Sequence, residues 1–332
     1  SEAYLGLEDY FQLEGFAYRL VPIRTPRGGG YELGRVGVER LYENLMNTYN
    51  DHSRVDLINN PNAKKNEQYP YLWGGFNDPK VYHCDDNVRL VSLIRQVHDR
   101  LARQLLRDGD TKRAEAILDQ GNKVLPNEIF PYTTVMSNMG GYTQSNIFYM
   151  QDYFSLHTPS ADQKGMDMAN KIWDGYVELF NWYENADDRT LEIHRDDIHY
   201  DLMFLNYMLT NTKFPNNGLA PRYKELKFDK MADFYAKYIN NSISNKLRQP
   251  DFDQQAVAND FQELHEVMTI ARLSGNKAIA DKVEQMANSQ FDAMEAANPG
   301  MGSAYRNFSN SISRPDVEEA EETADTTPEG EK

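Results

Sequence analysis

The sequence predicts a mainly α fold, in which antiparallel helical hairpins follow a short α/β lead-in and precede a disordered acidic tail. Three observations support this prediction. Apolar residues recur at three- and four-residue steps through most of the chain, as they do on one face of an α-helix. Short turns with glycine separate pairs of such segments. The last residues, in contrast, are acidic and almost free of large apolar side chains.

Residues 1–84 are expected to form the irregular α/β lead-in. Aromatic and aliphatic residues alternate with other types up to Pro22, which is typical of a short strand. The Gly-rich loop 24–34 lacks the Lys-Ser/Thr ending of a phosphate-binding P-loop, so nucleotide binding is not expected there. A helix is predicted over 38–49, and the polar, Asn-rich segment 50–71 is predicted to be a long surface loop.

The next segment predicts a helical hairpin. Gly109 is expected to end its first helix, because glycine tolerates the left-handed conformation of a C-terminal cap, and Pro126 closes the second helix. The buried face of the first helix is predicted to contain Leu90, Leu93, Ile94, Val97, Leu101 and Leu105. Small residues at Ala102, Ala114 and Gly121 would allow the two helices to approach closely. This pattern resembles a tetratricopeptide repeat, which needs neighbouring repeats to bury its faces.

Two further hairpins are predicted around Ser160 and Gly275, because a small residue follows each of them five positions later, as one follows Gly109. Ser160 would replace the turn glycine, which makes the middle hairpin degenerate. Together the hairpins predict a tetratricopeptide-like helical array over 85–298. Residues 299–332 are predicted to form the disordered acidic tail.

Composition narrows the function classes. The chain has 332 residues, a hydrophobic content of 40%, a charged content of 26% and a formal net charge of −16. Binding to nucleic acid or to an anionic membrane surface needs clustered Lys and Arg, so neither is expected of this acidic chain. No apolar run approaches the roughly 18 residues of a transmembrane helix. Cys84 is the single cysteine, so neither a disulfide framework nor a Cys-based zinc site is expected.

Two motifs carry a resemblance to a known protein family. The first is YLGLEDYFQLEGFAYRLVP, residues 4–22, and the second is WGGFNDP, residues 73–79, which is followed by Val81, Tyr82 and the first hairpin. In this order they resemble the soluble C-terminal region of a multi-pass membrane family found mainly in Bacteroidetes, the protein O-mannosyltransferase-like proteins of glycosyltransferase-C type. The resemblance covers most of residues 1–210 and, weakly, the last hairpin.

The resemblance implies a location and a role. The chain would lie on the periplasmic side of the inner membrane, tethered by transmembrane helices that precede Ser1. It would bind acceptor proteins or partner subunits for the membrane-embedded domain. Acidic catalytic residues of such glycosyltransferases lie near the first transmembrane helices, so no catalytic residue is assigned in this chain and no cofactor is expected. The start at Ser1, without Met or a signal peptide, is expected of a fragment or processed product.

A second interpretation is a glycan-binding protein, similar to the starch-utilisation outer-membrane lipoproteins of the same bacteria, which also carry tetratricopeptide-like helices. Those proteins should begin with a signal peptide and a lipid-anchored cysteine, and Cys84 lies too deep in the chain to be that anchor. A third interpretation, a stand-alone enzyme, has no supporting constellation of residues.

The segment 192–201 holds the densest polar cluster of the sequence. On a helix, His194, Asp197 and Asp201 would share one face, and one imidazole with two carboxylates can hold Zn²⁺ or Mn²⁺. The alternative is a helix start, at which acidic residues are stabilised by the positive end of the helix dipole.

Aromatic residues provide candidate contacts for a peptide or a glycan. Core packing is the expected role of those at helical spacing in the middle hairpin, which are Trp173, Tyr176, Phe180 and Tyr183. Binding is instead assigned to aromatic residues beside a polar loop or off that stripe, which are Tyr69, Tyr71, Trp73 and Trp182. In the tail, Asp325-Thr326-Thr327 resembles the short O-glycosylation acceptor sequence of these bacteria, which makes Thr326 a candidate for glycan attachment.

Overall fold

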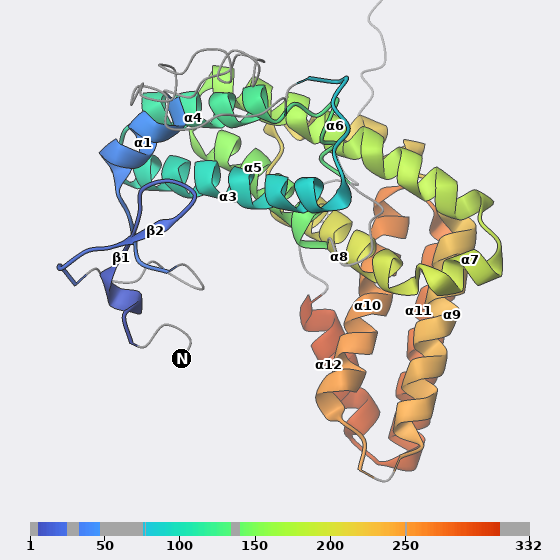
Figure 1. The fold of residues 1–332 in the computed structure, drawn as a ribbon. Coiled ribbons are helices and arrows are strands. Elements are labelled where there is room, and N and C mark those ends of the chain that lie inside the picture. The colour runs from blue at the N-terminus through green and yellow to red at the C-terminus, as the bar shows by residue number, and fades with distance from the viewer. Residues whose placement is uncertain are drawn as a thin grey trace, which may run out of the picture. The chain divides into compact units, whose positions relative to one another are not determined.

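The computed structural model describes residues 6–24, 33–46, 76, 78–133, 140–249 and 251–312. Most of these residues are helical, and a small three-stranded sheet lies near the N-terminus, which confirms the predicted mainly α fold with a short α/β lead-in (Figure 1). The chain packs as two units. Unit 1 contains residues 1–175 and 214–218, and unit 2 contains residues 176–213 and 219–332. The boundary between the units falls inside one long helix.

The lead-in of unit 1 is built on the sheet. Its strands β1 (Phe11–Leu13), β2 (Tyr18–Leu20) and β3 (Arg35–Val36) lie in the order β2-β1-β3. Strand β1 pairs with β2 antiparallel and with β3 parallel. Gly34 precedes β3 with a φ of +63°, and a Cβ there would lie 2.2 Å from the carbonyl oxygen of Phe11. Only glycine therefore fits this connection without strain.

The first predicted hairpin is confirmed. Helix α3 (Asp85–Arg107) packs against α4 (Thr111–Val124), and α1 (Val38–Met46) contacts both. Gly109 has a φ of +80° in the turn, as its predicted role in the C-terminal cap requires. The Asp110 side chain accepts a hydrogen bond from the backbone N–H of Arg113, which caps α4.

The buried face of α3 differs from the prediction in its N-terminal half. Leu90 and Leu93 are 49% and 56% exposed, so their assignment to the core was wrong. The side chains of Val91, Arg95 and His98 are fully buried instead. They follow the same three- and four-residue steps, so the helix is amphipathic as predicted but its buried face is rotated by about one residue.

The second hairpin joins α5 (Gly140–Ser155) to α6 (Pro159–Asn185). His157 takes the left-handed conformation in this turn, with a φ of 53°, at the position that Gly109 occupies after α3. Ser160 already belongs to α6, so the prediction that Ser160 replaces the turn glycine was wrong by three residues. A histidine is tolerated in this conformation because the cost for a non-glycine residue is modest.

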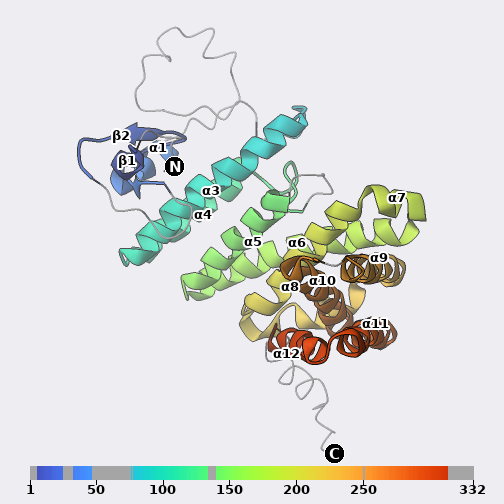
Figure 2. The same ribbon diagram turned by 90° about the horizontal axis from the view of Figure 1, so that it is seen from below.

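Unit 2 continues from the end of α6 through six α-helices. They are α7 (Asp188–Ile193), α8 (Arg195–Asn211), α9 (Asp229–Leu247), α10 (Gln254–Leu273), α11 (Lys277–Ala297) and α12 (Met301–Ile312). Helix α10 packs against α8, α9, α11 and α12, and Figure 2 views α9 to α12 nearly end-on. Short 3₁₀ helices cover Pro215–Asn217 in unit 1 and Ala220–Glu225 in unit 2. The predicted hairpin turn at Gly275 is confirmed by its φ of +78°.

Helix α12 lies within residues 299–332, which were predicted to form the disordered tail. The predicted start of the tail was therefore too early in the chain. Its Tyr305 ring lies 5.7 Å from the ring of Phe261 on α10, which gives the helix a buried contact. The Glu295 carboxylate accepts hydrogen bonds from the backbone N–H groups of Gly300 and Ser303, at the start of α12. The remainder of the predicted tail, residues 313–332, lies outside the described residues.

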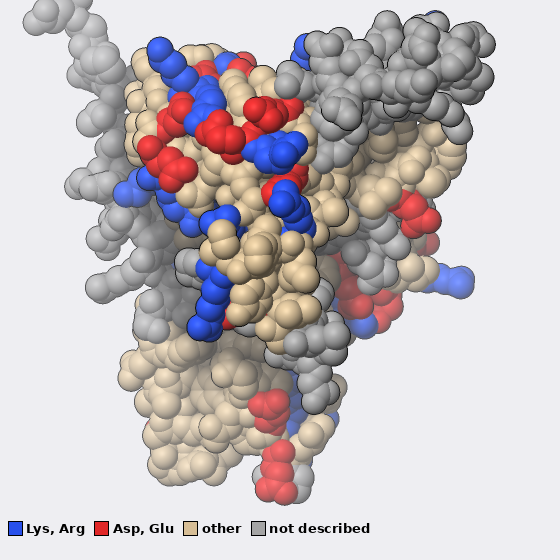
Figure 3. Space-filling view, turned by 60° about the vertical axis from the view of Figure 1, so that its left-hand side comes forward, with Lys and Arg blue, Asp and Glu red and all other residues tan. Residues whose placement is uncertain are grey.

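Charged side chains of both signs lie close to one another on the face that Figure 3 shows. Figure 3 shows Lys and Arg interspersed with Asp and Glu in the upper part of that view, rather than gathered by sign. Ion pairs such as Arg113–Glu39 at 2.9 Å and Lys164–Asp119 at 2.6 Å agree with this picture. Among the helices that the structure describes, none is both long enough and apolar enough to span a bilayer.

Candidate functional site

The structure brings several of the predicted site residues together in unit 2. Trp182 lies near the end of α6, His194 joins α7 to α8, and Asp197 and Asp201 lie on α8. The other predicted residues lie outside the described part of the chain, and their binding or glycosylation stays a prediction. They are Tyr69, Tyr71, Trp73 and Thr326.

Local capping fixes the path of the chain through this site. The Asp187 side chain accepts a hydrogen bond of 2.8 Å from the backbone N–H of Thr190, which starts α7. His194 ends α7 and begins α8, and Asp196 and Asp197 lie in the first turn of α8. The alternative interpretation of this cluster as a helix start is therefore confirmed, because both carboxylates lie at the positive end of the α8 dipole.

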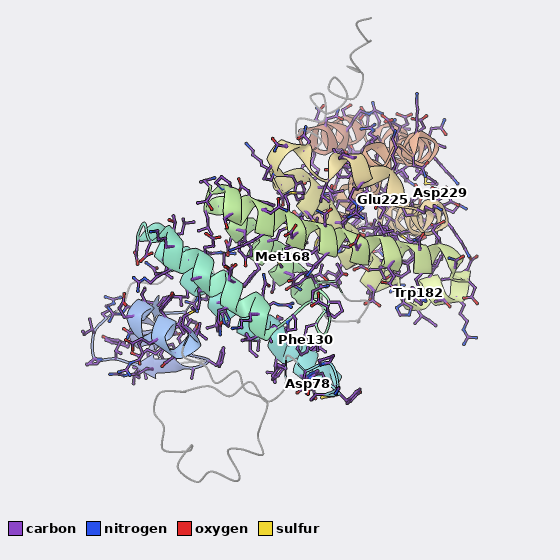
Figure 4. The ribbon with its side chains drawn as sticks, turned by 90° about the horizontal axis from the view of Figure 1, so that it is seen from above. Asp78, Phe130, Met168, Trp182, Glu225 and Asp229 are labelled. Atoms are coloured by element: carbon purple, nitrogen blue, oxygen red, sulfur yellow. The ribbon has the colours of Figure 1, made fainter. Side chains whose placement is uncertain are left out.

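Trp182 forms the exposed part of the site. Its side chain is 43% exposed, whereas the aromatic residues of the predicted core stripe are fully buried. The indole, labelled in Figure 4, meets the His194 ring in a T-shaped contact with 5.1 Å between ring centroids. His194 Nδ1 lies 2.8 Å from Asp197 Oδ2, and the imidazole is half-buried. The carboxylate therefore orients the imidazole, and the imidazole supports one edge of the indole.

Asp201 lies one helical turn beyond Asp197 and faces the interior of unit 2. Its Oδ2 accepts a hydrogen bond of 2.9 Å from the Tyr183 hydroxyl. Burial raises the pKa of Asp201 to about 7, an effect that the hydrogen bond from Tyr183 partly offsets and the charge of Asp197 increases. The pKa of Tyr183 is also raised, first by burial and then by the charge of Asp201.

The three predicted metal ligands are not assembled into a metal centre. The Asp201 carboxylate bonds to the Tyr183 hydroxyl, whereas Asp197 bonds to His194, whose ring contacts Trp182. Within the described residues, no group of three or more His, Cys, Asp and Glu side chains could hold a metal ion. We therefore interpret His194 and Asp197 as a hydrogen-bonded pair that supports Trp182.

This arrangement is suited to binding. A large, half-exposed aromatic side chain held by a packed neighbour loses little conformational freedom when a ligand contacts it. Ile193, at the end of α7, is 69% exposed and adds apolar surface in the same connection. The imidazole beside the indole is 29% exposed and can form a hydrogen bond with a polar group of the ligand.

A second cluster of titratable groups lies between α8, α9 and α10 and was missed by the sequence analysis. The Tyr235 hydroxyl donates a hydrogen bond of 2.5 Å to Glu263 Oε2, and His199 Nδ1 lies 3.3 Å from the same oxygen. The hydrogen bond with Glu263 raises the pKa of His199 although burial opposes this effect. Burial raises the pKa of Glu266, which is only 5% exposed, to about 7.

The partners of His199 are 36 and 64 positions away along the chain, so helical spacing around His199 does not reveal them. A usable signal existed on α10, where Asp260 and Glu266 stand at helical spacing among apolar residues such as Val257, Val267 and Ile270. Acidic residues on a core-facing stripe indicate a buried partner on a neighbouring helix.

Comparison of this chain with protein-family models, with curated proteins and with solved structures found no match.

Proposed function

We propose that this chain is the periplasmic C-terminal helical-repeat domain of a multi-pass membrane protein of the O-mannosyltransferase-like type, and that its role is binding rather than catalysis. Its partners would be acceptor proteins or subunits, which it would present to the membrane-embedded domain upstream of Ser1. The two lead-in motifs and the helical hairpins support this proposal. Helical-hairpin proteins most often act through their surfaces.

The observation that carries the binding role is the exposed Trp182 supported by His194 and Asp197. The other large aromatic side chains of α6 are fully buried, whereas Trp182 is 43% exposed. Tryptophan is enriched among the residues that dominate the energy of protein interfaces, and truncating such a residue costs about 2 kcal/mol or more of binding free energy. We therefore assign Trp182 to the contact with the acceptor or partner.

The test uses the parent membrane protein in its own cells. Trp182→Ala should reduce glycosylation of exported proteins, measured by quantitative glycoproteomics, while the level of the protein in the membrane stays unchanged. Phe308→Ala is the matched control, because Phe308 is a similarly exposed aromatic residue (40%) of unit 2 outside this site. Equal glycosylation in wild type and both variants would contradict the role of Trp182.

The membrane assignment has its own test. The coding sequence upstream of Ser1 should encode several transmembrane helices, and the protein should be recovered in the inner-membrane fraction with this domain accessible to protease from the periplasm. A secretion signal with a lipid-anchored cysteine upstream of Ser1 would contradict this assignment and favour the outer-membrane lipoprotein interpretation.

A further inference from the structure

Unit 1 contains a hollow between α4, α5 and α6, with a volume of about 260 Å³. Asp119 and Asn122 of α4, Tyr153 of α5 and Lys164 of α6 line one side of it. Met168 of α6 also lines the hollow and is labelled in Figure 4. None of these residues belongs to the site around Trp182.

The polar groups of the hollow form one connected network. The Tyr153 hydroxyl donates a hydrogen bond of 3.0 Å to Asp119 Oδ1 and accepts one of 3.1 Å from Asn122 Nδ2. Lys164 Nζ donates to Asp119 Oδ2 over 2.6 Å and to Glu115 Oε1 over 2.7 Å. Hydrogen-bond donors and acceptors therefore alternate along the lining of the hollow, and these hydrogen bonds hold them in place.

This network retains capacity for a ligand. The Asp119 side chain is 43% exposed and the Lys164 side chain is 36% exposed. A carboxylate accepts about four hydrogen bonds and an amide group makes up to four, which is more than the network uses. A ligand hydroxyl can donate to Asp119 and accept from Lys164 or Asn122 at the same time, since a hydroxyl group is both a donor and an acceptor.

The rest of the lining limits the charge of the ligand. Lys171 and Glu128 form an ion pair of 3.3 Å at the rim, and Asp167 lies beside them. The lining holds three carboxylates and two ammonium groups, and Glu115 adds a fourth carboxylate beside Lys164, so an anion is repelled, while the ion pairs already offset part of the negative charge. A neutral ligand is favoured.

The apolar lining and the size limit the shape of the ligand. Pro126 is the more exposed apolar residue of the lining, and the largely buried Tyr132, Tyr153 and Met168 add carbon atoms behind the polar groups. Its volume of about 260 Å³ is slightly below the common range of small-molecule pockets, which starts at about 300 Å³. One six-membered ring with its substituents fills such a space, with C–H groups on the carbon surface and polar groups on the network.

We propose that this hollow is a binding site for a neutral, polyhydroxylated ring of monosaccharide size. Adjacent hydroxyl groups of the ring bind to Asp119, Asn122 and Lys164, and the ring carbons lie against Pro126, near the buried Met168 side chain. This site is independent of the function proposed for Trp182, and either assignment can fail without the other.

The test follows the Met168 methyl group in the full chain. The protein is labelled with ¹³C at the methionine methyl groups, and the Met168 signal is assigned with Met168→Leu. Glucose, mannose and galactose are titrated separately, with a dissociation constant in the range of about 1–10 mM expected for a single ring. The Met168 signal should shift and saturate with at least one hexose, whereas glycerol and inorganic phosphate should leave it in place.

Two variants locate the binding. Asp119→Asn and Lys164→Met should each weaken hexose binding at least tenfold, whereas Asp108→Asn and Lys112→Met, which change exposed residues outside the hollow, should not. Because the Lys164 ion pairs are partly exposed, their loss should not unfold the chain. No shift with any hexose, a shift that both site variants retain, or a shift caused by phosphate would each overturn the proposal.

Discussion

The Tyr183 hydroxyl and the Asp201 carboxylate form a hydrogen bond of 2.9 Å inside unit 2, where both side chains are buried. A charged carboxylate at this position costs free energy, because burial removes it from water and one hydrogen bond compensates only in part. The pKa of Asp201 is raised to about 7 because the charged form is disfavoured by this burial. The ionisation of Asp201 therefore links the stability of unit 2 to pH near neutrality.

Asp201→Asn tests this linkage. The folded pKa of about 7 lies above the ordinary value of 3.8, so protonation of Asp201 stabilises the fold at low pH, and this contribution is lost as pH rises through 7. Between about pH 5.5 and 8.5 the wild type should lose about 2 kcal/mol relative to the variant, since one pKa unit corresponds to about 1.4 kcal/mol. Urea unfolding of both proteins at the two pH values measures this difference. A constant difference would contradict the buried charge.

His199→Gln should destabilise the fold more at mildly acidic than at alkaline pH. The pKa of His199 is raised above 6.5 by its hydrogen bond with Glu263, so its stabilising contribution is complete below pH 6.5 and is lost above the folded pKa. Urea unfolding across this range measures the effect. In a Glu263→Gln background the substitution should lose its pH dependence, and an unchanged pH dependence there would show that another group is responsible.

Arg95→Met should lower stability by about 3 kcal/mol or more, because three buried neutral acceptors lose their donor and each unsatisfied group costs about 1–3 kcal/mol. The Arg95 guanidinium is fully buried and donates to Asn146 Oδ1 and to the carbonyl oxygens of Leu125 and Phe130, at 2.8 to 3.1 Å. Thermal unfolding compares the variant with Arg107→Met, an exposed arginine of the same helix that should change stability by less than about 0.5 kcal/mol. Similar effects of the two substitutions would contradict a structural role for Arg95.

Gly121→Ala should destabilise unit 1 by about 1–3 kcal/mol, the usual cost of overpacking. A Cβ at Gly121 would lie 2.2 Å from the Tyr149 hydroxyl, which donates a hydrogen bond of 2.7 Å to the carbonyl oxygen of Leu118. Tyr149→Phe removes that oxygen, so the double variant should be more stable than the two single effects predict when added. A double-mutant cycle by urea unfolding measures this coupling, and strict additivity would count against the close approach.

Local patterns predicted most helices and the turns at Gly109 and Gly275, because helical periodicity and a glycine at positive φ are properties of short segments. The turn between α5 and α6 was placed at Ser160 instead of His157, because no glycine marks it. The helix α12 was missed because its contacts with Phe261 and its cap at Glu295 come from other helices.

The positions that depend on partners far along the chain could not be predicted. Burial of Arg95 instead of Leu93 depends on acceptors 30 to 51 positions away. Trp182 and His194 lie 12 positions apart on different elements, so their ring contact depends on how α6, α7 and α8 pack. Buried polar networks are tertiary features, and helical spacing alone does not reveal them.

The most direct test of the proposed function is a comparison of glycosylated exported proteins in cells that make the parent membrane protein with and without residues 1–332. Glycosylation should be lost in the cells with the truncated protein, while that protein remains in the membrane at its normal level. Unchanged glycosylation with the truncated protein would contradict a role of this domain in presenting acceptors or partners to the membrane-embedded domain.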